Sequence, residues 1–281
     1  MMDRLIRLNF GSSPLRFSPT SSNPALLNPA ITSAAHGDVC TVTGVVNCTG
    51  MAIVATIGGG VLGGGAVQQW PGAMLPIFIL SLVVTLIAFF LIYRNPANAV
   101  WAIWPYALAE GVMLGAITVM LDQWLVQLGY IAFGGLALQA FIITISITMG
   151  MLGLYWARIL KPTKKFQAVL MVLTVGIILT YVTSMVVGLF NGTGLPFVSM
   201  NSALEGGSTA WIGLGISVLF LGVASFWLIL DFGRVEHFVN TGMPRKMQWY
   251  LAFSLLVTLA WIYLEAVKLA FRMAILTGQR R

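Results

Sequence analysis

Three acidic residues lie within long apolar segments of the chain. Glu110 is found in PYALAEGVMLGAIT, Asp231 in FWLILDFGRVEHF and Glu265 in AWIYLEAVKLAFR. A charged side chain at the centre of a bilayer costs about 2.5–3.5 kcal/mol even on insertion scales, so such residues usually face a bundle interior or a wet cavity. The sequence therefore predicts that these three acids belong to a pH-sensitive cation pathway.

Asp231 and Glu265 could act together as a pH sensor. Carboxyl groups that approach each other cannot both ionise cheaply, so such a pair can share a proton and respond to pH. When ionised, the same groups offer the hard oxygen ligands that Ca²⁺ prefers. We therefore predict that Asp231 and Glu265 form a pH sensor and a Ca²⁺ site, with Glu110 as a further member of the ion pathway.

Each acid also has a purely structural explanation. Glu110 could be a protonated acid that is hydrogen-bonded inside the bundle. Asp231 could form an ion pair with Arg234, and Glu265 one with Lys268, because residues three apart share a helix face. Four charged or titratable residues close to the acids are predicted to modulate them: Arg234, Glu236, His237 and Lys268.

The composition is that of a membrane protein. Hydrophobic residues make up 58% of the 281 residues and charged residues 8%, and the mean hydropathy is +0.92. These values do not describe a soluble surface. The net charge of +7 comes from short basic clusters between apolar segments, which are typical of topology signals and of contacts to anionic lipid headgroups. We expect membrane lipids as partners and no nucleic acid.

Seven apolar stretches are each near the roughly 20 residues that a helix needs to cross a bilayer. The predicted fold is therefore all-α, a polytopic membrane protein with a bundle of seven transmembrane helices. The first stretch contains GGGVLGGG, whose missing side chains allow close approach of another helix. The predicted spans are 45–67, 74–93, 99–120, 130–156, 166–190, 211–232 and 249–271.

Two regions follow from this pattern. Residues 1–43 are rich in Ser, Pro, Asn and Thr and show no apolar periodicity, so they cannot bury enough apolar surface to offset their ordering entropy. We predict that they form a mostly disordered cytoplasmic tail. Residues 44–281 form the seven-helix transmembrane domain.

The basic residues predict the orientation. The loops after the first, third and fifth spans contain no Lys or Arg, and eleven of the fifteen basic residues lie on the other side. The positive-inside rule makes that side cytoplasmic, with the N-terminus inside. We expect a multi-pass protein of the cell's inner (plasma) membrane. The eleven residues are Arg4, Arg7, Arg16, Arg94, Arg158, Lys161, Lys164, Lys165, Arg234, Arg245 and Lys246.

The last span leaves two topologies open. Seven crossings would place the C-terminus outside, where Lys268, Arg272, Arg280 and Arg281 oppose the positive-inside rule. Alternatively, the last segment is re-entrant and returns to the cytoplasm. We favour seven crossings.

Motifs of soluble enzymes are absent from the sequence. It contains no HExxH, no GxSxG, no Walker loop and no Cys or His cluster with metal-ligand spacing. We expect a protein that is not an enzyme and has no cofactor, with Ca²⁺ only as a possible transported ion.

Several segments resemble a known family. The N-terminal SSNPAL, the segment AEGVMLGAIT, the KPTKKF loop and above all LILDFGRVEHFVNTGMPRKMQWYLAFSLLVTLAWIYLEAVKLA are similar to the bacterial branch of the Bax inhibitor family of seven-helix membrane proteins, also called the YccA-like family. The resemblance covers most of the chain after about residue 45, together with the SSNPAL segment.

The resemblance implies a Ca²⁺ leak that is closed or opened by protonation of a two-acid sensor on the sixth and seventh helices. Asp231 in LILD matches the acid of the sixth helix. Glu265 in IYLE matches the position on the seventh, where a glutamate replaces the family's aspartate. Glu110 matches the acid of the family's E-G-x-x-L-G stretch.

One feature departs from the family pattern. The two acids are 34 residues apart, which is longer than a compact hairpin. If the chain turns at Thr241 and Gly242, Asp231 lies about 15 Å from the turn and Glu265 about 35 Å from it. The acids would then meet only if the connection formed its own helix or the last helix started late.

The leading hypothesis is thus a pH-sensitive Ca²⁺ leak channel or a proton-coupled Ca²⁺ exchanger, with Ca²⁺ and protons as its ligands. The alternative is a non-transporting membrane scaffold or regulator of a membrane protease or stress pathway, which would bind a membrane protein partner. A secondary transporter for another solute ranks last, because no internal repeat is apparent.

Overall fold

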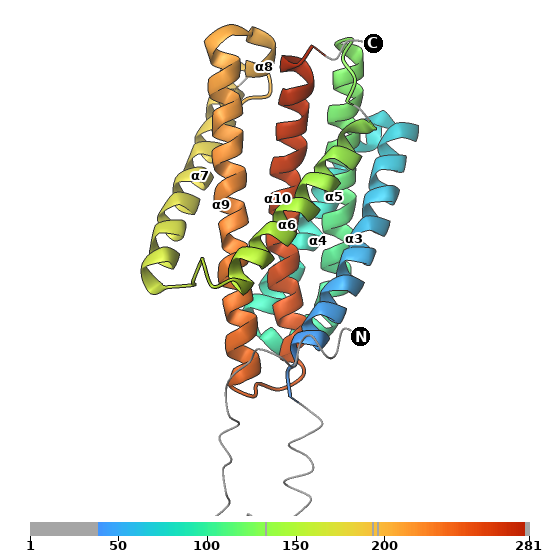
Figure 1. The fold of residues 1–281 in the computed structure, drawn as a ribbon. Helices are drawn as coiled ribbons and strands as arrows, with labels where there is room; N and C mark the ends of the chain where they lie inside the picture. The colour runs from blue at the N-terminus through green and yellow to red at the C-terminus, as the bar shows by residue number, and fades with distance from the viewer. Residues whose placement is uncertain (1–38, 133, 193, 196, 279–281) are drawn as a thin grey trace, which may run out of the picture. The chain divides into compact units, whose positions relative to one another are not determined.

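Seven long helices build the part of the chain that the computed structural model describes, residues 39–132, 134–192, 194–195 and 197–278 (Figure 1). All seven are long and apolar enough to cross a membrane. They are α3 (Val42–Gln69), α4 (Met74–Arg94), α5 (Ala99–Gln127), α6 (Gly135–Trp156), α7 (Lys164–Asn191), α9 (Gly207–Asn240) and α10 (Met247–Leu276). Short turns of helix, η2 (Pro71–Ala73), η3 (Pro96–Asn98) and α8 (Ser202–Glu205), connect them.

The predicted all-α, seven-span membrane fold is confirmed, but six of the helices are longer than the predicted spans, and α6 is shorter because it begins at Gly135 instead of residue 130. The sixth span was predicted to end at residue 232, whereas α9 continues to Asn240. Hydropathy identifies only the apolar part of a helix. Backbone hydrogen bonds can continue the same helix through the polar residues that follow. Most of the predicted tail, residues 1–38, lies outside the described residues.

The last helix is uninterrupted. α10 runs through 30 residues, which corresponds to about 45 Å at 1.5 Å per residue and exceeds the ~30 Å of a hydrocarbon core. A re-entrant segment would need a break near its midpoint. The structure therefore favours the crossing over the re-entrant alternative.

α10 is the central helix of the bundle. It packs against α9, α6, α3 and α5, and 61% of its most apolar window is buried, compared with 11% in both α6 and α7. α7 packs on α9 at the outside of the bundle (Figure 1). Polar groups on α10 are therefore the ones most strongly shielded from lipid and water.

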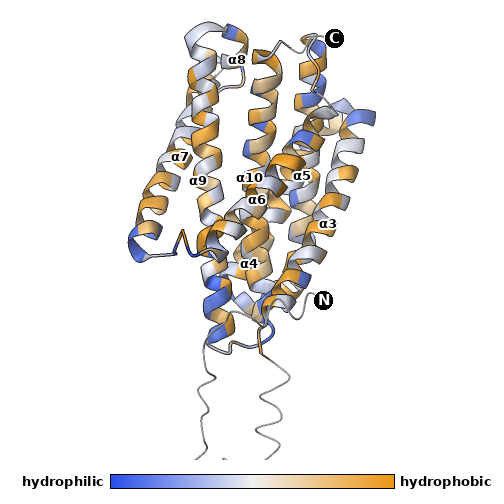
Figure 2. Ribbon diagram, in the orientation of Figure 1, coloured by the Kyte–Doolittle hydropathy of each residue, from blue (hydrophilic) through white to orange (hydrophobic). Residues whose placement is uncertain are grey.

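Most of the described basic residues, all except Lys268 and Arg272 of α10, gather at one end of the bundle, which we call the basic end. The helices alternate in direction, so the turns from α4 to α5, from α6 to α7 and from α9 to α10 lie on the same side (Figures 1 and 2). That this end is cytoplasmic stays a prediction of the positive-inside rule. The basic end comprises Arg94, Arg158, Lys161, Lys164, Lys165, Arg234, Arg245 and Lys246.

The glycine run of α3 forms a backbone contact with α5, as the sequence predicted. A Cβ built on Gly59 would lie 2.3 Å from the carbonyl oxygen of Leu108, and one on Gly63 would lie 2.2 Å from that of Val112. The relation is reciprocal, because a Cβ on Gly111 of α5 would lie 2.0 Å from the carbonyl oxygen of Thr56. Small residues of this kind let membrane helices pack backbone to backbone.

We predict that Gly59→Ala destabilises the protein, whereas Gly58→Ala does not. The added methyl group of Gly59→Ala meets the α5 backbone, which cannot move aside cheaply, and overpacking of this kind costs about 1–3 kcal/mol. Gly58 has open space at the same point. Thermal unfolding of the purified protein in detergent should show a lower Tm only for Gly59→Ala, and an equal Tm for the two variants would contradict the contact.

Candidate functional site

Asp231 is buried between α9 and α10. Only 2% of its surface is exposed. Its carboxylate accepts hydrogen bonds from Thr258 Oγ1 at 2.6 Å and Ser254 Oγ at 2.8 Å, both on α10. Arg234, one turn further along α9, donates to Oδ1 at 3.0 Å. The charge is thus neutralised from its own helix, and hydroxyl groups from the neighbouring helix bind both oxygens.

Glu265 is buried between α10 and α7, with 1% of its surface exposed. Oε1 accepts three hydrogen bonds: from Lys268 Nζ at 2.8 Å, from the Tyr181 hydroxyl of α7 at 2.8 Å and from Trp261 Nε1 at 3.3 Å. The lysine also lies over the Tyr181 ring, 4.4 Å from its centroid. Oε2, by contrast, is buried without a hydrogen-bond partner among the described residues.

The two acids belong to separate networks. In the described part of the chain no hydrogen bond or ion pair joins Asp231 to Glu265. Thr258, which bonds Asp231, precedes Glu265 by seven residues, or about 10 Å along α10. The gap is smaller than the sequence estimate because α10 begins only at Met247, after a turn of six residues. It remains too wide for the predicted pair to share a proton directly.

Glu110 stands apart from both. It lies on α5 with 8% of its surface exposed, and no hydrogen bond or ion pair to it occurs among the described residues. The neighbouring Gly111 lines a cleft of about 920 Å³ between α3, α5, α6 and α10. The lining is largely apolar, with the hydroxyl groups of Thr118 and Tyr263 among its few polar groups. The structure thus places Glu110 beside the cleft without making it part of the lining.

The predicted modulators divide into two groups. Arg234 and Lys268 are the direct ion-pair partners of the two buried acids. Glu236 instead accepts hydrogen bonds from the Tyr155 hydroxyl and from Arg158, and His237 is exposed at the end of α9. This second pair therefore belongs to the surface of the basic end.

Arg272 is a buried charge that the sequence analysis did not single out as a site residue. It is 2% exposed and donates to Ser202 Oγ and to the backbone carbonyls of Val198 and Ser199, at 3.0 Å each. No carboxylate forms an ion pair with it in the described residues, and its Nε has no partner there. The signal in the sequence is the spacing of Glu265, Lys268 and Arg272, which places all three on one face of a helix.

Gly213 makes room for this arginine. A Cβ at Gly213 of α9 would lie 2.2 Å from a terminal nitrogen of the Arg272 guanidinium and 2.6 Å from Ser202 Oγ. The guanidinium therefore lies against the α9 backbone while it holds the connection between α7 and α9. Backbone carbonyls thus take the place of a counter-ion for Arg272, at the end of the bundle opposite the basic end.

The described side chains do not form a metal site made of several protein ligands. Among the described residues no group of three or more His, Cys, Asp or Glu side chains converges. An ion at Asp231 would be bound by one carboxylate together with hydroxyl groups. At Glu265 it would meet the unpartnered Oε2. These are the hard oxygen ligands that Ca²⁺ accepts, but the structure does not bring the two predicted metal-binding acids to one ion.

Comparison with known proteins gives one family. The family described as Bax inhibitor 1 like matches residues 18–274. No curated protein and no solved structure matches the chain.

We predict that Gly213→Ala loosens the connection between α7 and α9. The added methyl group displaces the Arg272 guanidinium and breaks its bonds to residues 198–202, which should lower the free energy of unfolding by about 1–3 kcal/mol. Chymotrypsin should then cleave after Phe197 faster than in the unmodified protein. Gly215→Ala is the matched control, because that position of α9 faces open space. Equal cleavage of the two variants would show that Arg272 does not hold this segment.

Proposed function

We propose that this chain, which belongs to the Bax inhibitor 1-like family, conducts cations across the membrane under the control of protons that bind Asp231 and Glu265. We further propose Ca²⁺ as the ion, moving either through a leak or by exchange with protons. The family match over residues 18–274 and the seven membrane-spanning helices are the starting point.

The unpartnered Oε2 of Glu265 is the observation that carries the proposal. A buried polar atom without a hydrogen-bond partner costs about 1–3 kcal/mol, and more when its group is charged, so such atoms call for an explanation. A proton or a cation bound at Oε2 would satisfy it. Because the same carboxylate binds Lys268 and Tyr181, occupation of Oε2 would weaken both contacts and hence the contact between α10 and α7.

Asp231 links α10 to α9 in a similar manner. Its two oxygens accept hydrogen bonds from Thr258, Ser254 and Arg234. A protonated carboxyl carries a donor of its own and loses the charge that attracts the guanidinium, so it is a poorer partner for three donors. Protonation of the two acids therefore favours separation of α10 from both neighbours, and we expect flux to rise as the pH falls.

A row of polar side chains runs along one face of α10 and includes residues from the networks of both acids. Ser254, Thr258, Glu265, Lys268 and Arg272 follow one another at steps of three, four or seven residues, so they share one face of the helix. The row spans about 27 Å of helix length, which is most of the hydrocarbon thickness. It provides the only charged groups on the described part of α10 that lie at membrane depth.

A second function is favoured by a different feature of the same site. Each buried acid already has its own cation three residues away, which is also what a stationary structural pair would need. A membrane scaffold or regulator that transports nothing would retain such pairs for stability alone. Flux measurements separate the two proposals.

We predict that Asp231→Asn and Glu265→Gln each abolish the pH dependence of Ca²⁺ flux into proteoliposomes. Unmodified protein should conduct about fivefold or more faster on the acidic side of neutrality than on the alkaline side, which corresponds to a modest coupling free energy. The neutral amides cannot gain a proton, so their flux should vary less than about twofold. Glu205→Gln, the same change at an exposed position in α8, should behave like the unmodified protein.

Two results would contradict the proposal. If Asp231→Asn and Glu265→Gln both kept the pH dependence of the unmodified protein, the acids would not be the sensor. If the unmodified protein gave no Ca²⁺ flux at any pH, the non-transporting regulator would take the place of the channel.

A further inference from the structure

A separate cavity opens at the basic end of the bundle, and none of its lining residues belongs to the hydrogen-bond networks of Asp231 and Glu265. Its volume is about 280 Å³, and it lies between the end of α6, the turn that leads into α7 and the last turns of α9. Arg158 and Lys161 of the turn line it, together with Tyr155 of α6 and Glu236, His237 and Asn240 of α9. The cavity is therefore rich in hydrogen-bond donors.

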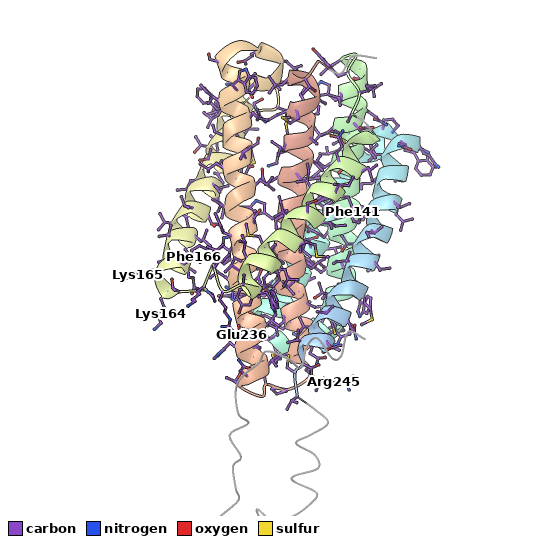
Figure 3. All side chains as sticks on the ribbon, in the orientation of Figure 1. Phe141, Lys164, Lys165, Phe166, Glu236 and Arg245 are labelled. Atoms are coloured by element: carbon purple, nitrogen blue, oxygen red, sulfur yellow. The ribbon has the colours of Figure 1, made fainter. Side chains whose placement is uncertain are left out.

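The charges of the cavity are not balanced. Glu236 is its only carboxylate, and both oxygens of Glu236 are engaged: one accepts from the Tyr155 hydroxyl and the other from Arg158 at 3.1 Å. Lys161 has no ion-pair partner among the described residues. Lys164 and Lys165 begin α7 at the same end of the bundle (Figure 3). The lining thus keeps an excess of positive charge beside an acid that is already neutralised.

The backbone at Arg158 points to a role for its side chain. Arg158 has a φ of +59°, and it is the only non-glycine residue with a positive φ in the described part of the chain. It follows the end of α6 where Ile159 N bonds to Leu154 O and Arg158 N to Tyr155 O, a helix ending in which this position is usually glycine. A residue with a Cβ is disfavoured in that conformation, and strain of this kind tends to persist where a side chain is needed.

The turn that carries these residues lies directly on α9. A Cβ at Gly233 would lie 2.5 Å from Cγ of Pro162, so the missing side chain lets the turn approach the helix. The walls of the cavity are held together by this contact and by the bonds of Glu236. The basic side chains are therefore presented by a fixed surface.

We expect the cavity to lie at the depth of lipid headgroups. It occupies the point at which α6 ends and α7 begins, and the last residue of α6, Trp156, is exposed there, as is typical of aromatic residues at a membrane interface. Basic pockets between membrane helices bind the headgroups of anionic lipids. Arginine binds phosphate through two parallel hydrogen bonds, and lysine adds a point charge.

We propose that this cavity binds a phosphate group, held by Arg158 and Lys161, with His237 and Asn240 as further polar contacts. The shared chemistry is that of an anionic phospholipid headgroup or of free phosphate. The depth of the cavity favours the lipid. This site is independent of ion transport, because it shares no residue with the networks of Asp231 and Glu265.

Native mass spectrometry of the purified full chain in detergent tests the site. The protein is mixed with equal amounts of phosphatidylglycerol and phosphatidylcholine, and the ratio of the two bound lipids is measured. Each of Arg158→Gly and Lys161→Ala should lower this ratio about fivefold, the effect of one basic residue near an anionic lipid. Lys246→Ala, which removes the same charge from an exposed position of the basic end outside the cavity, should leave the ratio unchanged.

Arg158→Gly also allows a second measurement, thermal stability, which should not fall together with lipid binding. Glycine suits the positive φ, so the variant should have a Tm equal to or above that of the unmodified protein while it loses the lipid. Millimolar inorganic phosphate distinguishes the two sources: displacement of phosphatidylglycerol shows that free phosphate also fits, and no displacement shows that the intact headgroup is required.

Two results would overturn the proposal. One is an equal lipid ratio for the unmodified protein and both cavity variants. The other is a fall in the ratio for Lys246→Ala as large as that for Lys161→Ala, because general surface charge would then explain the binding.

Discussion

A charge that is buried in apolar surroundings needs charged or polar partners close by, and this constraint shapes the centre of the bundle. Asp231 and Glu265 each have a cation three residues further along the same helix, Arg234 and Lys268. Each carboxylate also accepts hydrogen bonds from another helix, Asp231 from Ser254 and Thr258 of α10 and Glu265 from Tyr181 of α7. The contacts of α10 with α9 and α7 therefore depend on the charge of two acids.

Two acids in separate networks act differently from two acids that share a proton. A shared proton would couple the groups directly, whereas here each acid can gain a proton while the other stays charged. Coupling between them has to pass through α10 itself, over about 10 Å of helix that carries Thr258 at one end and Glu265 at the other. Under the proposed function, movement of α10 at one of the two acids would be transmitted along the helix to the other.

The sequence was sufficient for the fold and for the local pairs, but not for the contacts between helices. Seven spans follow from hydropathy, and the Arg234 and Lys268 pairs follow from helical spacing, because both depend on residues close in the chain. The donors from other helices, such as Tyr181 to Glu265, depend on the relative register of helices, which the length of a turn alters. Arg272 could not be assigned partners because most of its acceptors are backbone carbonyls, which any residue type supplies and which the sequence therefore does not reveal.

The bundle thus contains two kinds of helix contact, one without titratable groups and one built on carboxylates. The contact between α3 and α5 is made by glycines and backbone carbonyls, none of which titrates. The contacts of α10 with α9 and α7 are made by carboxylates, whose hydrogen bonds change when they gain a proton. α10 also packs against α3 and α5, so the contact built from glycines lies beside the contacts built on carboxylates. Any movement driven by protons is consequently expected on the side of α10 that faces α7 and α9.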